Sequence, residues 1–181
     1  MEEIKKKKIS KFLSFVLRHH PETIHLSLDE NGWAMVSELM EKISHGHQPF
    51  SKSELEEIVA TNEKKRFAFN ADHTKIRASQ GHSFPVNLSL HPTSPPPCLY
   101  HGTATQFLDG IRLAGLQKMD RQFVHLSSDF VTAEKTGSRK GKPVVLTILA
   151  EKMQVDGFLF YISENGVWLC EAVPAHYIQF S

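Results

Sequence analysis

Cysteine is nearly absent from this 181-residue chain, which contains only Cys98 and Cys170. Two cysteines are too few for a disulfide framework or a cysteine-based zinc site. The sequence also lacks any apolar run of the roughly 18 residues that a membrane span needs. Its charged N-terminal run, Lys5 to Lys8, is not followed by an apolar signal segment. These absences predict a cytoplasmic protein with no membrane partner.

An excess of one charge is missing as well. The chain has 21 Lys and Arg residues against 20 Asp and Glu, a net charge of +1. Because the charge is balanced, an anionic partner must be bound by a local cluster of cations rather than by the whole surface. We interpret the run Lys5 to Lys8 as a solvated face, with contact to a phosphate backbone as the alternative.

Several motifs of known chemistry are missing too. There is no Gly-rich phosphate loop, no HExxH zinc motif and no Ser-His-Asp arrangement. The chain has 11 histidines, but their spacing forms no convincing metal site. We therefore expect a function that uses no metal.

The stretch Phe12 to Glu22 is the most informative in the chain. Apolar residues recur at helical spacing at Ile9, Phe12, Leu13, Val16 and Leu17. Pro21 predicts that this helix ends at His20. The spacing then predicts that Arg18 points away from the apolar face, that His19 lies at its edge, and that His20 returns to it as a core or capping residue. The helix dipole alone favours basic residues here, so a structural role stays open.

The rest of the first half predicts three helices and a hairpin, hence a winged-helix-like domain over residues 1–82. The pattern indicates a short extended piece after the turn at 29–32 and then a helix over 36–43, capped by Ser37 or a neighbour and broken at Gly46 to Phe50. A Ser51–Glu54 capping box begins the third helix, and the strands of the hairpin lie at 66–69 and 75–77.

Three adjacent cations, Lys64, Lys65 and Arg66, lie between the third helix and the hairpin. Such a cluster is stable on a solvated surface, which is the simplest interpretation. Arg66 also begins an alternating strand, which could direct its side chain into a groove. Either role is compatible with the sequence.

Residues 83–97 hold five of the nine prolines and no charged residue, which is typical of a stiff linker. Residues 98–181 then form a second domain with an α+β pattern of many short strands. We expect strands at 99–103, 123–127, 143–149, 157–161 and 167–169, and helices at 105–114, ended by Gly115, and at 129–135.

Polar residues of the second half include His101, Gly102 and His125. Gly102 would let the main chain approach a flat ligand such as nicotinamide closely. His101 and His125 each lie on a predicted strand, where a hydrogen-bonded structural histidine is the alternative. By the same reasoning, Arg121 and Arg139 could be ordinary surface arginines.

Together these pieces resemble the NAD-dependent RNA 2′-phosphotransferases, whose bacterial members are called KptA. Eight segments carry the resemblance, in the order found in that family: SKFLSFVLRHHPE (10–22), LDENGW (28–33), KKRFAF (64–69), IRASQGHS (76–83), LYHGTA (99–104), RQFVHLS (121–127), GKPVVL (141–146) and ENGVWL (164–169). The resemblance implies an N-terminal winged-helix-like RNA lobe and a C-terminal NAD lobe related to ADP-ribosyltransferase toxins.

The resemblance also implies roles for particular residues. An Arg-His-Arg-Arg catalytic set corresponds to Arg18, His19, Arg66 and Arg121. NAD-contacting motifs correspond to His101, Gly102, Thr103, His125, Ser127 and Arg139, and RNA contacts to Lys64 and Lys65. Lys140 follows Arg139 where relatives commonly have histidine, a departure that bears on a contact near the cofactor.

The implied reaction moves an internal RNA 2′-phosphate, as at a tRNA splice junction, to NAD through an RNA-2′-phospho-ADP-ribose intermediate. Its products are 2′-OH RNA, ADP-ribose 1″,2″-cyclic phosphate and nicotinamide, and no metal takes part. We expect a monomer. Two alternatives stay open: an ADP-ribosyltransferase that caps terminal phosphates of RNA or DNA, and a non-enzymatic winged-helix nucleic-acid binder.

Overall fold

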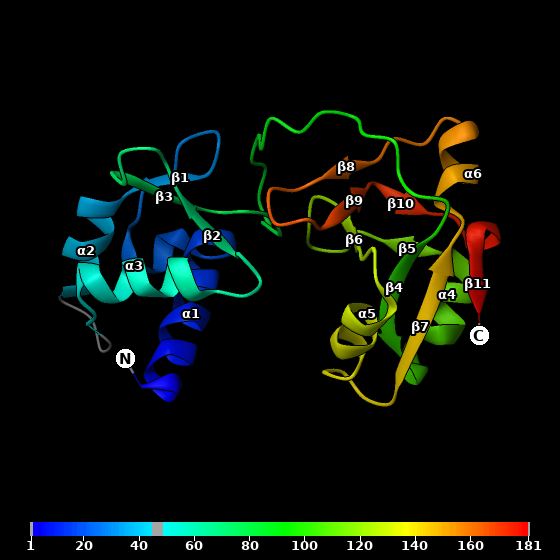
Figure 1. Ribbon diagram of the computed structural model, residues 1–181, viewed down its shortest axis with the longest axis horizontal. Coiled ribbons are helices and arrows are strands. Elements are labelled where there is room, and N and C mark those ends of the chain that lie inside the picture. Colours follow the sequence, from blue (N-terminus) through cyan, green and yellow to red (C-terminus); the bar gives the residue numbers. More distant parts are fainter. Residues whose placement is uncertain (1, 45–48, 181) are drawn as a thin grey trace. The chain divides into compact units, whose positions relative to one another are not determined.

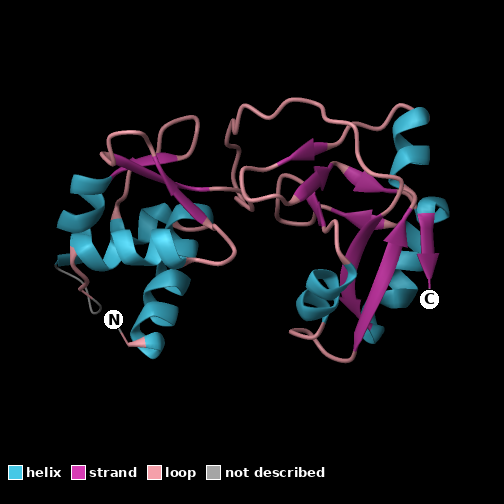
Figure 2. Ribbon diagram, in the orientation of Figure 1, coloured by secondary structure: helices cyan, strands magenta, loops and turns pink. Residues whose placement is uncertain are grey.

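The computed structural model describes residues 2–44 and 49–180, which divide into two compact units, Met1–Ser89 and Leu90–Ser181 (Figure 1). Each unit combines helices with small antiparallel sheets, as Figure 2 shows, so the predicted α+β class is confirmed. Each also has its own hydrophobic core. Within the described ranges, no helix combines the length and the apolar character needed to cross a bilayer.

Over residues 2–44 and 49–89, the first unit contains three α-helices, one 3-10 helix and a three-stranded sheet. Its elements are α1 (Glu3–Arg18), η1 (Pro21–Ile24), β1 (Trp33–Met35), α2 (Val36–Ser44), α3 (Lys52–Thr61), β2 (Phe67–Phe69) and β3 (Lys75–Ala78). The sheet order is β1-β3-β2 with antiparallel pairing throughout. The predicted hairpin is therefore present as β2 and β3. The extended piece after the 29–32 turn is β1, the third strand of the same sheet.

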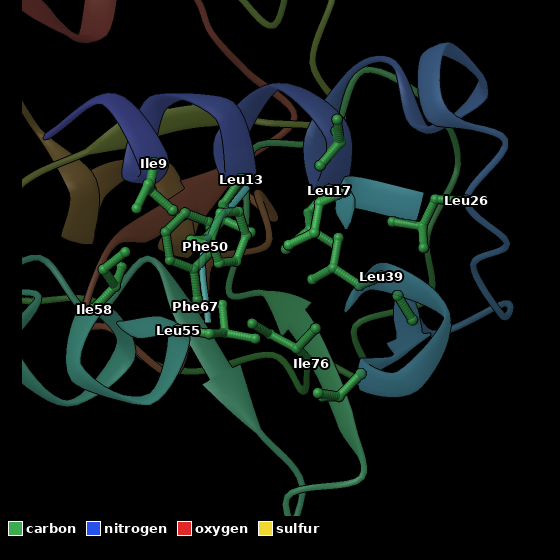
Figure 3. Close-up of a cluster of buried hydrophobic side chains, with 14 of the residues drawn as sticks. Ile9, Leu13, Leu17, Leu26, Leu39, Phe50, Leu55, Ile58, Phe67 and Ile76 are labelled. Atoms are coloured by element: carbon green, nitrogen blue, oxygen red, sulfur yellow. The ribbon is translucent and has the colours of Figure 1, made fainter. Parts of the chain in front are cut away.

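Apolar side chains from all three helices meet the sheet in one core (Figure 3). Leu13 and Leu17 of α1, Leu39 of α2 and Leu55 of α3 are completely buried. Removing one such side chain would cost about 2–5 kcal/mol of stability, so this core holds the end of α1 firmly in place. The apolar residues whose spacing predicted the first helix are thus the face of α1 that packs into this core.

The helix ends agree with the predictions in one case and not in another. Ser51 and Glu54 form the predicted capping box on α3. Ser37 does not cap α2, because that helix already begins at Val36, whose N–H donates to the carbonyl of Thr74 in the hairpin turn. The predicted break at Gly46 to Phe50 falls largely on residues 45–48, which lie outside the described residues.

The proline-rich segment 83–97 belongs partly to each unit, and each part is hydrogen bonded within its own unit. On its first side, Asn87 donates its N–H to Glu30, and Val86 is buried. On its other side, Thr93 donates its N–H to the carbonyl of Phe160. The division at Ser89 and Leu90 falls inside this segment.

Over the described residues 90–180, the second unit contains eight strands in three small sheets. Its elements are β4 (Leu99–Ala104), η2 (Thr105–Phe107), α4 (Leu108–Ala114), β5 (Leu116–Gln117), β6 (Val124–Leu126), α5 (Phe130–Gly137), β7 (Pro143–Ile148), α6 (Ala150–Val155), β8 (Tyr161–Ile162), β9 (Trp168–Cys170), β10 (Ala172–Val173), η3 (Ala175–Tyr177) and β11 (Ile178–Phe180). The sheet orders are β11-β7-β4, β6-β9-β8 and β10-β5.

Most predicted elements of this unit are present, with local differences. Gly115 ends α4 with a positive φ of 73°, as expected of a helix terminator. The strand predicted at 157–161 is only Tyr161–Ile162, because residues 157–158 form the turn that follows α6. The short elements α6, β5, β10 and β11 were not predicted, since so few residues carry no readable periodicity.

Candidate functional site

The first candidate cluster lies at the C-terminal end of α1. Arg18 is the last helical residue and His19 is the C-cap, with the N–H of His19 donating to the carbonyl of Phe15 at 3.0 Å. His20 was expected to return to the apolar face, and that prediction is wrong. His20 is exposed and its ring contacts Glu22 at 2.9 Å. The helix stops two residues earlier, so its angular spacing no longer applies at His20.

Arg18 and Arg66, predicted from segments 48 residues apart, are brought together. The Arg18 Nη2 donates to the carbonyl oxygen of Arg66 at 3.3 Å, and the guanidinium carbon lies 6.0 Å from the centre of the Phe67 ring. Arg66 directly precedes β2. His19 follows Arg18 in the chain, so the main chains of three of the predicted catalytic residues lie close together in the first unit.

A segment with no predicted role, Ser79 to Ser83, holds this cluster in place. Ser79 donates its N–H to the Arg66 carbonyl at 2.9 Å and its hydroxyl to the Lys65 carbonyl at 2.7 Å. Ser83 donates its N–H to the Arg18 carbonyl at 2.9 Å. The segment therefore fixes the end of α1 and the start of β2 to each other. Its only sequence signal is the IRASQGHS motif, which resembled the family without indicating a role.

His82, inside the same segment, is a buried imidazole beside positive charge. Its exposed fraction is 1%, and neither ring nitrogen has a hydrogen-bond partner among the described residues. Burial lowers the pKa of His82 to about 4, and the nearby charges of Arg18, His19 and Arg77 act in the same direction. His82 is therefore neutral at physiological pH and adds no charge to the cluster.

Lys64 and Lys65 lie on the turn between α3 and β2 with exposed side chains. The N–H groups of both residues donate to Asn62, and Lys65 has a left-handed φ of 41°. The turn presents two cations next to Arg66. This placement is compatible with the predicted contact to an anionic backbone.

The second candidate cluster lies in the second unit and joins His101, His125 and Arg121. His101 on β4 contacts the carbonyl oxygen of His125 on β6 through Nδ1 at 3.0 Å. A carbonyl can only accept, so Nδ1 of His101 carries the proton and Nε2 offers a lone pair. Burial lowers the pKa of His101, and the charges of Lys140 and Arg121 act in the same direction, so its ring is neutral.

Arg121 is oriented by the imidazole of His125. Its Nη1 lies 2.5 Å from His125 Nδ1. Because a guanidinium only donates, Nδ1 must be the acceptor and the His125 proton must lie on Nε2. Partial burial lowers the pKa of Arg121, but an arginine starts so high that it stays charged. The second cluster thus combines one fixed cation with two neutral imidazoles.

The missing side chain of Gly102 makes room for a neighbouring helix. A Cβ atom there would lie 1.7 Å from the carbonyl oxygen of Ala133 in α5. Gly137 of α5 is similarly constrained, because its Cβ would lie 2.4 Å from the carbonyl of Thr103. The close approach allowed by Gly102 is therefore that of helix α5. Thr103 is buried, 6% exposed.

Ser127 lies near this cluster, whereas no hydrogen bond or ion pair among the described residues connects Arg139 to it. Ser127 exchanges main-chain hydrogen bonds of 2.8 Å with Tyr100, the residue before His101. Arg139 is exposed in the loop after α5. Burial is the main cause of the lowered pKa of His101, and the charges of Lys140 and Arg121 add to it. Lys140, the residue that departs from the family pattern, is thus close enough for its charge to act on His101.

Two further features of the described residues bear on the site. A hollow of about 540 Å³ in the second unit contains none of the predicted site residues; it is lined by Lys118, Gln122, Phe123, Gly157, Phe158, Leu159, Tyr161 and Glu171. Nowhere in the described ranges do three His, Cys, Asp or Glu side chains gather as metal ligands do.

Arginines held next to neutral imidazoles are suited to binding a phosphate group, because guanidinium stays charged and binds phosphate oxygens in pairs. The two clusters therefore make the chain a candidate phosphate-binding protein.

Comparison with known proteins narrows this class. The model of a family described as "RNA 2'-phosphotransferase, Tpt1 / KptA family" matches residues 4–172. A probable RNA 2′-phosphotransferase from Flavobacterium johnsoniae is 55% identical over 180 residues, 99% of both chains. Another from Acaryochloris marina is 53% identical over 171 residues, 94% of both chains. The chain belongs to the RNA 2′-phosphotransferase family.

Proposed function

We propose that this protein is an NAD-dependent RNA 2′-phosphotransferase. Its first unit would be a winged-helix-like RNA lobe, and its second an NAD lobe of the ADP-ribosyltransferase-toxin type. The substrate would be RNA with an internal 2′-phosphate, as at a tRNA splice junction, and the enzyme would act as a cytoplasmic monomer. The observation that carries the proposal is the meeting of Arg18 with Arg66 beside His19, in a chain of this family.

In the first step the 2′-phosphate would attack the C1″ carbon of the nicotinamide ribose of NAD, and nicotinamide would leave. A phosphate monoester is largely a dianion near pH 7, so this attack requires no general base. The task that falls to the protein is to position the anion and to compensate its charge. Arg18 and Arg66 are suited to this task, since their separation is fixed by the Ser79 and Ser83 main-chain hydrogen bonds.

In the second step the ribose O2″ would attack the phosphodiester and release RNA with a free 2′-hydroxyl. Here a proton must leave O2″, and His19 is our candidate for accepting it. Arg66 and Arg121 would stabilise the charge that develops on phosphorus. The replacement His19→Ala should therefore let the RNA-2′-phospho-ADP-ribose intermediate accumulate. Equal slowing of both steps would exclude this role for His19.

The second unit offers groups suited to holding NAD. His101 presents an Nε2 lone pair, which can accept a hydrogen bond from an amide or a ribose hydroxyl. His125 presents an Nε2–H donor, and the Ser127 hydroxyl lies on the strand end that meets β4. Gly102 and Thr103 would contribute main-chain groups, and Arg139 and Lys140 positive charge. NAD supplies the electrophilic ribose carbon.

The proposal is tested by incubating the protein with NAD and a short RNA that bears one internal 2′-phosphate, without added metal, and analysing the products by mass spectrometry. Loss of the phosphate together with release of nicotinamide and ADP-ribose cyclic phosphate is the expected result. A stable gain of ADP-ribose on a terminal phosphate would favour the capping transferase instead. If neither the RNA nor NAD changes, the enzymatic proposals fail and a non-enzymatic nucleic-acid binder becomes the favoured function.

A further inference from the structure

The outward face of α1 carries lysines that neither cluster uses. Figure 3 shows Ile9, Leu13 and Leu17 directed from one side of the helix into the core. Lys7, Lys8 and Lys11 are exposed. None of these three lysines is paired with a carboxylate within the described part of the chain. Their charges are therefore available to an outside partner.

Two of these lysines form a row with Arg18. At about 100° per residue, Lys7, Lys11 and Arg18 lie within about 40° of one another around α1, and Lys8 lies at the edge of the row. At about 1.5 Å per residue, Lys11 lies about 10 Å and Lys7 about 16 Å from Arg18 along the helix axis. We call Lys7 and Lys11 the lysine row. It leads directly to the arginine proposed to bind the 2′-phosphate.

An exposed aromatic ring lies beside the row. Phe15 lies between Lys11 and Arg18 on the same face and is 43% exposed. The His20 ring lies against it with the ring centres 4.8 Å apart. Flat rings among cations are the usual composition of surfaces that bind single-stranded nucleic acid, in which phosphates contact the cations and bases stack on the rings.

We propose that the lysine row and Phe15 bind the single-stranded RNA that flanks the 2′-phosphate. The inference rests on the proposed function, because it places the 2′-phosphate at Arg18. An acidic protein would also complement the lysines, but it would give no role to the ring between them. A strand stacked as in a duplex has one phosphate per about 3.4 Å, so the distance from Arg18 to Lys7 corresponds to about five nucleotides.

The enzyme should therefore prefer long substrates. The test compares kcat/KM for a ten-nucleotide RNA and for a dinucleotide that carry the same internal 2′-phosphate, with NAD saturating. The ratio of the two values should be lower by about tenfold in K7Q/K11Q than in the wild type, because two phosphate contacts are lost. The variant Phe15→Leu, which keeps an apolar side chain but removes the ring, should lower the same ratio less.

The matched control is K42Q/K52Q, which removes two lysines from helices α2 and α3 of the same unit. It should keep the wild-type ratio. An equal loss in K42Q/K52Q would overturn the proposal, because net charge rather than the row would then be responsible. An unchanged ratio in K7Q/K11Q would overturn it as well.

A binding measurement separates this inference from the proposed function. Fluorescence anisotropy with an unphosphorylated ten-nucleotide RNA, without NAD, reports on the surface alone. K7Q/K11Q should bind this RNA more weakly than both the wild type and K42Q/K52Q. Its plot of log affinity against log salt concentration should also be shallower, by about 1.4 in slope, because two phosphate contacts are lost. If K7Q/K11Q binds this RNA more weakly but the wild type turns over no substrate, the proposed function is refuted and the RNA-binding surface is supported. Equal RNA binding by all three proteins would refute the surface.

Discussion

The two clusters hold their arginines in different ways. In the first unit Arg18 donates to a main-chain carbonyl, that of Arg66, at 3.3 Å. In the second unit Arg121 contacts an imidazole nitrogen, His125 Nδ1, at 2.5 Å. A carbonyl oxygen accepts at every pH, whereas an imidazole nitrogen accepts only while it is unprotonated. The first arginine is therefore anchored permanently, and the second depends on the charge state of a neighbour.

This difference shows how the same residue type can be preorganised by different parts of the protein. The Ser79 to Ser83 segment ties Arg18 and Arg66 through hydrogen bonds to the carbonyls of residues 18, 65 and 66. The second cluster relies on side chains carried by β4 and β6, with α5 packed against Gly102. Changes to the segment should therefore act on Arg18 and Arg66 together, whereas changes around β4 act through strand and helix packing.

Replacing either arginine by lysine should have the largest effect. Lysine keeps the charge but cannot bind two phosphate oxygens at once, so Arg18→Lys and Arg121→Lys should each lower kcat/KM for 2′-phosphorylated RNA by about 100-fold or more. The control Arg112→Lys alters an exposed arginine that lies over the Phe180 ring at 5.2 Å. Steady-state kinetics would check this prediction, and wild-type activity in either cluster variant would remove that arginine from the mechanism.

Adding one methyl group at Gly102 should destabilise the second unit. The new Cβ would lie 1.7 Å from the Ala133 carbonyl, so α5 must shift, at a cost of about 3 kcal/mol or more. Gly110→Ala is the matched control, because a Cβ at Gly110 would meet nothing within 4 Å and Ala favours the helix α4. Urea unfolding would measure both variants. Equal stability of G102A and the wild type would show that α5 does not pack as described.

His82 should make the chain less stable in acid. Its pKa is 6.5 ordinarily and about 4 when folded, so between these values the unfolded chain binds the proton and the folded chain does not. Stability is therefore lost as the pH falls from 6.5 to about 4, by about 3 kcal/mol in total. His82→Leu should remove this part of the pH dependence, and the exposed His91→Leu should not. Urea unfolding at several pH values would measure it; identical pH dependence in His82→Leu would refute the assignment.

The smallest effect is expected from the Ser79 hydroxyl. Ser79→Ala removes its 2.7 Å hydrogen bond to the Lys65 carbonyl, at a cost of about 1 kcal/mol. Ser163→Ala is a control in the second unit, where a buried serine hydroxyl lies 2.7 Å from Asn165 Oδ1 and 3.0 Å from the Val167 carbonyl, and accepts from the Val167 N–H at 3.1 Å. Both changes should lower stability, but only Ser79→Ala should raise KM for RNA while leaving KM for NAD unchanged. An equal rise in both variants would indicate a general packing effect.

Much of the fold follows from local patterns. The apolar spacing from Ile9 to Leu17 predicted α1, Ser51 and Glu54 predicted the start of α3, and Gly115 predicted the end of α4. Such patterns depend on residues within a few positions of one another, so they can be read along the chain. The prediction failed at His20 and Ser37, where the helix boundary differed by one or two residues from the expected position.

The sequence by itself determined which residues could form the clusters, because the types Arg, His and Lys and their segments are visible in it. Only the tertiary structure decided how they are held. The contact of Ser83 with Arg18 joins residues 65 positions apart, and α5 packs against Gly102 so closely that a Cβ there would lie 1.7 Å from the Ala133 carbonyl. His82 is likewise buried beside a residue 50 positions away, since a Cβ at Gly32 would lie 3.3 Å from His82 Nε2. Contacts of this kind arise when distant segments pack, and no local periodicity encodes them.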